Sequence, residues 1–153
     1  MFIEINLENS VKFLNTITKY ISHYYFIEKL AFSKFICECG IKFTDSNLYK
    51  EHPYMTLRLF AIRNNLASIH EKEKKYEKSL NQLDLCKKSL NSNYDKIIFY
   101  NNYIRIYNQI KNKNGHKSYL NLWKEFLIEE INNMKNTNLF YSDNNKFNFI
   151  HIL

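Results

Sequence analysis

Glycine and proline are almost missing from this chain of 153 residues, which contains 2 Gly and 1 Pro. Loops that cradle nucleotide phosphates are rich in glycine, so this scarcity argues against that class of site. The motifs of serine hydrolases and zinc peptidases are absent as well. The histidines are scattered without the spacing of metal ligands: His23, His52, His70, His116 and His151. We therefore expect a protein without catalytic activity, bound metal or cofactor.

Cysteine is also scarce, and Cys37, Cys39 and Cys86 form an odd number without the spacing of a zinc site. Free thiols are typical of a reducing compartment, so we expect the cytoplasm, with the nucleus as the alternative. On a helix, Cys37 and Cys39 would point to nearly opposite sides, which disfavours a shared metal ion. Their expected role is that of small buried apolar residues.

Long apolar runs are the third absence, because no uninterrupted stretch approaches the length of a bilayer span. The first residues include Glu4 and Glu8 and lack the basic stretch and apolar run of a secretory leader. We expect a soluble protein without a membrane span.

Aromatic residues are abundant and make up 16% of the chain, together with many Asn, Lys and Ile residues. The rings supply the apolar area that an ordered core requires, although the mean hydropathy is negative. The abundant residues share AT-rich codons, which indicates an AT-rich genome. A chain of this length forms one domain by default and can bury a core without disulfides.

Apolar residues recur at helical spacing along most of the sequence, and this pattern predicts an all-α protein. We expect a single helical domain over residues 1–135. Its three antiparallel helix hairpins are predicted at about 10–40, 54–92 and 95–135. Residues 136–153 form a C-terminal tail, polar at first and then apolar, which either frays or folds back onto a protein surface.

Capping and turn residues give the expected ends of the helices. Ser10 is suited to cap the first helix, and Gly40 is suited to end the second. Residues 44–53 hold the only proline and predict a loop. The second helix is expected to bury one side: Ile27, Leu30, Ala31 and Phe35. In the third hairpin, a turn is expected at about 112–115, and the last helix is expected to use Leu120, Trp123, Leu127 and Met134.

The second hairpin contains a run of residues at the spacing of a known helical repeat. Residues 63–91 read R-N-N-L-A-S-I-H-E-K-E-K-K-Y-E-K-S-L-N-Q-L-D-L-C-K-K-S-L-N. This stretch resembles a tetratricopeptide repeat, a helix hairpin that binds proteins. The resemblance rests on these residues: Leu66, Ala67, His70, Tyr76, Ser79, Leu83 and Cys86. The family's usual tryptophan, second-helix aromatic and terminal proline are replaced by Arg63, Leu83 and Asn91.

The same pattern is echoed one hairpin later, where F-Y-N-N-Y-I-R-I-Y follows I-R-N-N-L-A-S-I-H at an offset of 37 residues. Large residues replace the small ones in this third hairpin, at Ile104, Tyr119 and Phe126. Around Trp123, Phe126 and Glu130, the chain resembles the half-a-TPR repeat of RNA-processing scaffolds; a core tryptophan on an amphipathic helix is the alternative. His52-Pro53 ahead of N-N-L-A is similar to the longer repeats of kinesin light chains.

The tetratricopeptide resemblance implies a short right-handed solenoid of about three hairpins, whose first helices form a concave surface. The residues expected on that surface are Asn64, Asn65, Ser68, Asn101, Asn102 and Arg105. Asparagine side chains can bind the backbone of a peptide, and an arginine can bind a carboxylate in a bidentate pair. The alternative is that these asparagines lie on a solvated face without a partner.

Positive charge gathers near two of the predicted turns, and the net charge of the chain is +7. The lysines of this basic edge are Lys72, Lys74, Lys75, Lys111, Lys113 and Lys117. Such an edge would attract an acidic protein or a nucleic-acid backbone. Glu71, Glu73 and Glu77 lie among the first of these lysines, and their neutralising effect is the alternative interpretation.

Together these patterns predict a non-catalytic adaptor that binds a peptide or helix of a partner protein in a concave groove. The alternative is a structural subunit of a larger assembly, one that contains RNA or belongs to the cytoskeleton.

Overall fold

A computed structural model describes residues 6–90 and 92–136, and every regular element in these residues is a helix. The predicted all-α fold class is therefore confirmed. None of these helices combines the length and the apolar character needed to cross a membrane. The predicted tail lies almost entirely outside the described residues. The elements are α1 (Leu7–Phe26), α2 (Leu30–Ser46), α3 (Pro53–Lys72), α4 (Tyr76–Cys86), the short 3-10 helix η1 (Lys87–Ser89), α5 (Asn93–Gln109) and α6 (Lys113–Asn136).

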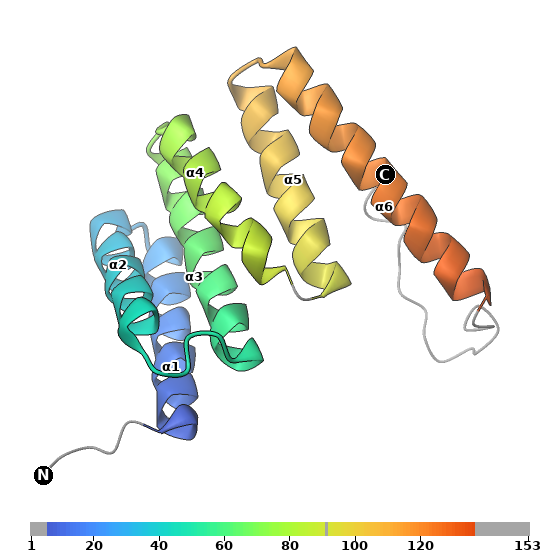
Figure 1. The fold of residues 1–153 in the computed structure, drawn as a ribbon. Helices are drawn as coiled ribbons and strands as arrows, with labels where there is room; N and C mark the ends of the chain where they lie inside the picture. The colour runs from blue at the N-terminus through green and yellow to red at the C-terminus, as the bar shows by residue number, and fades with distance from the viewer. Residues whose placement is uncertain (1–5, 91, 137–153) are drawn as a thin grey trace, which may run out of the picture.

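Successive helices pair as three antiparallel hairpins that follow one another through the molecule (Figure 1). Helix α3 packs against both α1 and α2, and α5 packs against α4. The turns α1–α2, α3–α4 and α5–α6 each lie at the upper end of their hairpin in Figure 1, and so on one edge of the row of hairpins. The first helix of each hairpin therefore ends at this shared edge.

All three turns have the same backbone conformation. Each contains one non-glycine residue with a positive φ: Glu28 at 59°, Lys74 at 58° and Lys111 at 55°. The N–H of the following residue donates to a carbonyl near the end of the first helix, over 2.8 to 3.0 Å. This left-handed residue satisfies helix-end carbonyls in the same way as a C-terminal cap glycine. The chain therefore repeats one hairpin turn three times, at spacings of 46 and 37 residues.

Two buried serines allow close packing in the first two hairpins. Ser33 on α2 donates its hydroxyl to the carbonyl of Ile21 at 2.9 Å, and Ser79 on α4 donates to the carbonyl of Ala67 at 2.7 Å. Both serines are fully buried, and both bonds reach back 12 residues. A larger residue at either position would separate the paired helices.

Gly40 does not end the second helix as predicted, because α2 continues to Ser46. A Cβ atom at Gly40 would lie 2.9 Å from Cδ1 of Ile62 and 3.2 Å from Cγ2 of Ile17. The glycine is therefore explained by the close approach of α1 and α3. As a consequence, the connection to α3 spans only residues 47–52.

The predicted buried side of the second helix is also wrong. Ile27, Ala31 and Phe35 are exposed, and Leu30 is only partly buried. The residues of α2 that are buried are Ser33, Cys37, Gly40 and Thr44. The side of α2 that faces the neighbouring helices consists of small residues. The prediction from large apolar residues therefore selected the exposed side of the helix.

The N-cap of α1 differs from the prediction as well. Asn6 occupies this position, and its side-chain oxygen accepts from the N–H of Asn9 at 2.9 Å. Ser10 lies one turn further on, is buried, and accepts a 3.0 Å hydrogen bond from Nδ2 of Asn47. Ser10 therefore joins α1 to the connection after α2.

Aromatic rings separate the two helices of the third hairpin. The rings of Tyr103 on α5 and Tyr119 on α6 stack with centroids 4.0 Å apart, and Phe126 is only 7% exposed. Gly115 lies in the first turn of α6 rather than in a loop, against the ring of Tyr107. The predicted face of the last helix is therefore rotated, and Leu120, Trp123 and Leu127 remain partly exposed.

A substitution at Gly40 tests the packing explanation. We expect Gly40→Leu to lower the free energy of unfolding by about 2 kcal/mol, because the new side chain has no space between Ile17 and Ile62. Urea unfolding followed by circular dichroism measures this change. Cys39→Leu is the control, since Cys39 is exposed on the same helix and its substitution should have little effect. Equal effects at the two positions would contradict the explanation.

His70 is a buried titratable residue near the end of α3. His70 is 5% exposed, and its Nδ1 atom lies 3.6 Å from the carboxylate of Glu73. That carboxylate also contacts Lys75 at 2.8 Å and Lys34 of α2 at 3.9 Å. Burial lowers the pKa of His70 below 6.5, and the nearby Lys34 charge lowers it further.

The lowered pKa of His70 predicts a loss of stability in mild acid. Below about pH 6.5 the unfolded chain binds a proton at His70 more readily than the folded chain does. The free energy of unfolding therefore decreases as the pH is lowered. We expect His70→Phe to reduce this dependence between pH 7.5 and 5, measured by urea unfolding. Glu73 has a lowered pKa and titrates below this window. An unchanged pH profile in the variant would refute the assignment to His70.

Candidate interaction surface

The predicted asparagine face lies on α3 and α5, and the structure brings part of it together. Nδ2 of Asn102 donates to Oδ1 of Asn64 at 2.6 Å, and Asn102 is 7% exposed. These two amides link the second hairpin to the third. Asn64 and Asn65 are partly buried, so Asn101 is the only exposed residue of these four asparagines.

Arg105 forms a bidentate ion pair within the chain. Its Nε donates to Oε1 of Glu71 at 2.8 Å, and its Nη2 donates to Oε2 of the same carboxylate. Gln109 donates to Oε1 of Glu71 at 2.6 Å. Because Arg105 donates these hydrogen bonds to the Glu71 carboxylate, its pKa is raised above its ordinary value. The guanidinium that was predicted to bind a partner's carboxylate therefore already holds one from α3.

A pocket of about 370 Å³ lies where the first helices of all three hairpins end. Tyr25 comes from α1, Ser68 and Lys72 come from α3, and Arg105 comes from α5. The remaining lining residues are Glu71, Lys74, Tyr76 and Gln109. We call these eight residues the turn pocket. Two members of the predicted asparagine face and two lysines of the predicted basic edge meet here.

The charge of the turn pocket is positive. Glu71 is only 10% exposed and is engaged by Arg105, which neutralises that pair. The ammonium of Lys72 lies 4.2 Å above the ring of Tyr25. Within the described part of the chain, neither Lys72 nor Lys74 has an acidic group within 4.0 Å. An anion that enters the pocket would meet two uncompensated ammonium groups.

Three other lysines of the basic edge line two further pockets. Lys75 lines one of about 480 Å³, together with Lys74 and Lys78, and this pocket reaches Ile110 at the end of α5. Lys111 and Lys113 line another, of about 270 Å³, beside Tyr107 and His116. Lys117 is exposed on α6. Of the glutamates expected to neutralise the first group, Glu73 pairs with Lys75, whereas Glu71 pairs with Arg105 instead.

The described residues contain no group of three or more His, Cys, Asp or Glu side chains arranged to hold a metal ion. Cys37 and Cys86 are fully buried, and burial raises the pKa of each thiol to about 12. Cys39 is exposed, which corrects the expectation that both cysteines of the C-x-C are buried. All three thiols are free.

Sequence reasoning missed Tyr25, Tyr76 and Gln109, and it assigned Glu71 only a neutralising role. The sequence contained a signal for the role of Glu71. At the offset of 37 residues between the second and third hairpins, Glu71 corresponds to Asn108, and Arg105 and Gln109 lie within one helical turn of that position. Opposite charges at a spacing of 34 residues would then face each other across neighbouring hairpins. No such signal was available for Tyr25, since the first hairpin has a different spacing.

Comparison with known proteins adds nothing to this picture, because no family model, curated protein or solved structure matches the chain.

The ion pair between Glu71 and Arg105 should couple the second and third hairpins. We expect a double-mutant cycle with Glu71→Ala and Arg105→Ala to give a coupling free energy of roughly 1 kcal/mol, which added salt weakens. Urea unfolding of the four proteins supplies the measurement. The control cycle pairs Arg105→Ala with Glu77→Ala, because Glu77 is exposed on α4. A coupling no larger than in the control would show that the pair does not hold the hairpins together.

Proposed function

We propose that this chain is a tetratricopeptide-like interaction module that binds an acidic peptide segment of a partner protein in the turn pocket. The observation that carries the proposal is the convergence of three hairpins on one positively charged pocket with aromatic walls. Tyr25 and Tyr76 would contact the apolar part of the peptide, and Lys72 and Lys74 would bind its carboxylates.

Several repeated features support the tetratricopeptide-like part of the proposal. The hairpin turn recurs three times with one left-handed residue, and Ser33 and Ser79 occupy the same place in the first two hairpins. Helix α3 packs against both helices of the preceding hairpin, as the first helix of a stacked repeat does. We infer a short right-handed solenoid with the first helices on its concave side.

The ligand chemistry differs from the one that the sequence favoured. Arg105 would have to release Glu71 before it could bind an external carboxylate, and Asn64 and Asn102 bind each other. The lysines therefore take over the recognition of acidic groups. Asn65 and Asn101 retain the role of binding peptide backbone beside the pocket. The free thiols support a reducing compartment such as the cytoplasm.

Selection of peptides by the purified chain tests this function. A library of short random peptides, displayed on phage, should yield sequences with Asp or Glu next to apolar residues. We expect Lys72→Glu/Lys74→Glu to weaken binding of a selected peptide by roughly tenfold or more, because the change reverses the charge of the pocket. Fluorescence polarisation with the synthetic peptide measures the dissociation constant.

The control for this experiment is Lys113→Glu/Lys117→Glu, which makes the same change in net charge at the turn of the third hairpin. The pocket variant should lose affinity, and the control should retain it. Failure to select any acidic peptide, or an equal loss in both variants, would contradict a specific site in the turn pocket.

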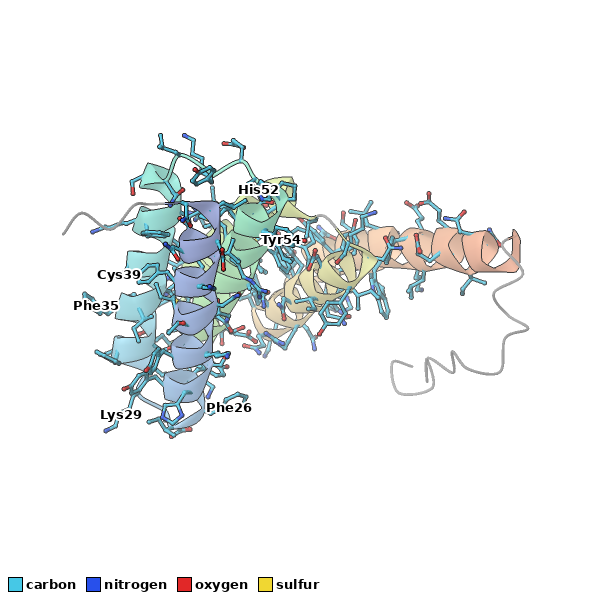
Figure 2. All side chains as sticks on the ribbon, turned by 90° about the horizontal axis from the view of Figure 1, so that it is seen from below. Phe26, Lys29, Phe35, Cys39, His52 and Tyr54 are labelled. Carbon is cyan, nitrogen blue, oxygen red and sulfur yellow. The ribbon has the colours of Figure 1, made fainter. Side chains whose placement is uncertain are left out.

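A structural subunit of a larger assembly is the second candidate, and the outer side of α2 favours it. Phe32 and Phe35 of α2 are exposed by 48% and 58%, and Phe26 at the end of α1 is exposed by 80%. Figure 2 shows Phe35 and Cys39 on the side of α2 that points away from the other helices. Exposed aromatic side chains of this kind are typical of surfaces that bury against a neighbour. Partner binding that survives Lys72→Glu/Lys74→Glu and is lost on Phe32→Ser/Phe35→Ser would select this candidate.

A further inference from the structure

In the first two hairpins, the second helix packs against the first helix of the next hairpin. The residues that make this contact can be located by counting from the left-handed residue of each turn. Counted from the left-handed turn residue, the ninth and twelfth residues are Cys37 and Gly40 on α2. Both lie against α3, in the cluster that contains Ile62. The same positions on α4 are Leu83 and Cys86, which pack with α5. Two hairpins therefore use equivalent residues to receive the helix that follows.

The equivalent residues on α6 are Leu120 and Trp123. Both are partly exposed, and among the described residues only α5 packs closely on α6. Leu127 and Ile131 continue the same side of the helix at spacings of four residues from Trp123. Leu127 is partly exposed and Ile131 is 41% exposed. We call Leu120, Trp123, Leu127 and Ile131 the α6 receiving face.

We propose that the C-terminal segment 137–153 of this same chain docks on the α6 receiving face. The segment begins directly after α6, and five of its last seven residues are large and apolar: Phe147, Phe149, Ile150, Ile152 and Leu153. Burying these side chains against the receiving face removes two apolar surfaces from water at once.

The segment is long enough to reach this face. Going back from Asn136 to Leu120 along α6 covers about 24 Å, at a rise of 1.5 Å per residue. The ten residues 137–146 can span roughly 33 Å when extended, which is enough for Phe147 to reach Leu120. Attachment to α6 also gives the segment an effective concentration on the order of millimolar, which favours it over a separate chain.

The indole N–H of Trp123 supports an occupant with backbone carbonyls. The nitrogen is buried and has no hydrogen-bond partner among the described residues. A buried donor without an acceptor costs free energy, so a small movement of the atoms over the indole that lets a carbonyl of the segment reach this N–H is favourable. Trp123 is also the single tryptophan of the chain, so its fluorescence reports on this face alone.

Quenching of Trp123 fluorescence by acrylamide tests the proposal on the full chain. We expect Phe147→Ser/Phe149→Ser to raise the quenching constant at least roughly twofold and to shift the emission to longer wavelength, because the indole becomes open to solvent. The matched control, Asn145→Ser/Asn148→Ser, should leave both quantities unchanged. Equal quenching in the wild-type protein and the phenylalanine variant would overturn the proposal.

A second pair of variants examines the receiving face itself. Ile131→Asn should increase quenching of Trp123, whereas Ile128→Asn should not, because Ile128 is exposed on another side of α6. Circular dichroism confirms that each variant remains helical. Protection of Trp123 that appears only at high protein concentration would assign the face to a second copy of the chain and also overturn the proposal.

Discussion

The paired helices of the first two hairpins pack with their backbones close together, and this close packing sets the arrangement of the other elements. Ser33 and Ser79 are fully buried, and each binds a carbonyl of the partner helix, so the helix backbones approach closely without leaving a polar group unsatisfied. Gly40 allows α2 to pack closely against the next hairpin as well, because the absence of a side chain leaves space for Ile17 of α1 and Ile62 of α3. Because the two helices of the first hairpin lie close together, α3 contacts both of them. The ends of the first helices meet at the turn pocket.

The third hairpin is joined to the second by a different kind of contact. Tyr103 stacks on Tyr119 and donates its hydroxyl to Asp84 of α4, and burial raises the pKa of Tyr103 so that this donor keeps its proton. The bonds between Asn64 and Asn102 and between Glu71 and Arg105 then fix α5 beside α3. Polar bonds thus place α5 next to the pocket, while aromatic rings set its distance from α6.

Helical content and the hairpin order could be predicted from the sequence, because apolar spacing is a local property and Leu66, Tyr103 and their neighbours follow it. The buried side of α2 could not, since its contact residues are small and no large apolar stripe marks them. The candidate site was predicted in part. Ser68, Arg105, Lys72 and Lys74 line the turn pocket, but the capture of Arg105 by Glu71 depends on how two hairpins stack.

We propose that the ends of the first helices form the binding surface of this protein. An NMR titration of the isotope-labelled full chain with an acidic peptide selected by it, following backbone amide shifts, tests this proposal. We expect the largest shifts at Tyr25 of α1, Ser68 of α3 and Lys74 of the turn between α3 and α4, which all line the turn pocket. Shifts concentrated on the outer side of α2, around Phe32 and Phe35, with none at the pocket, would contradict it.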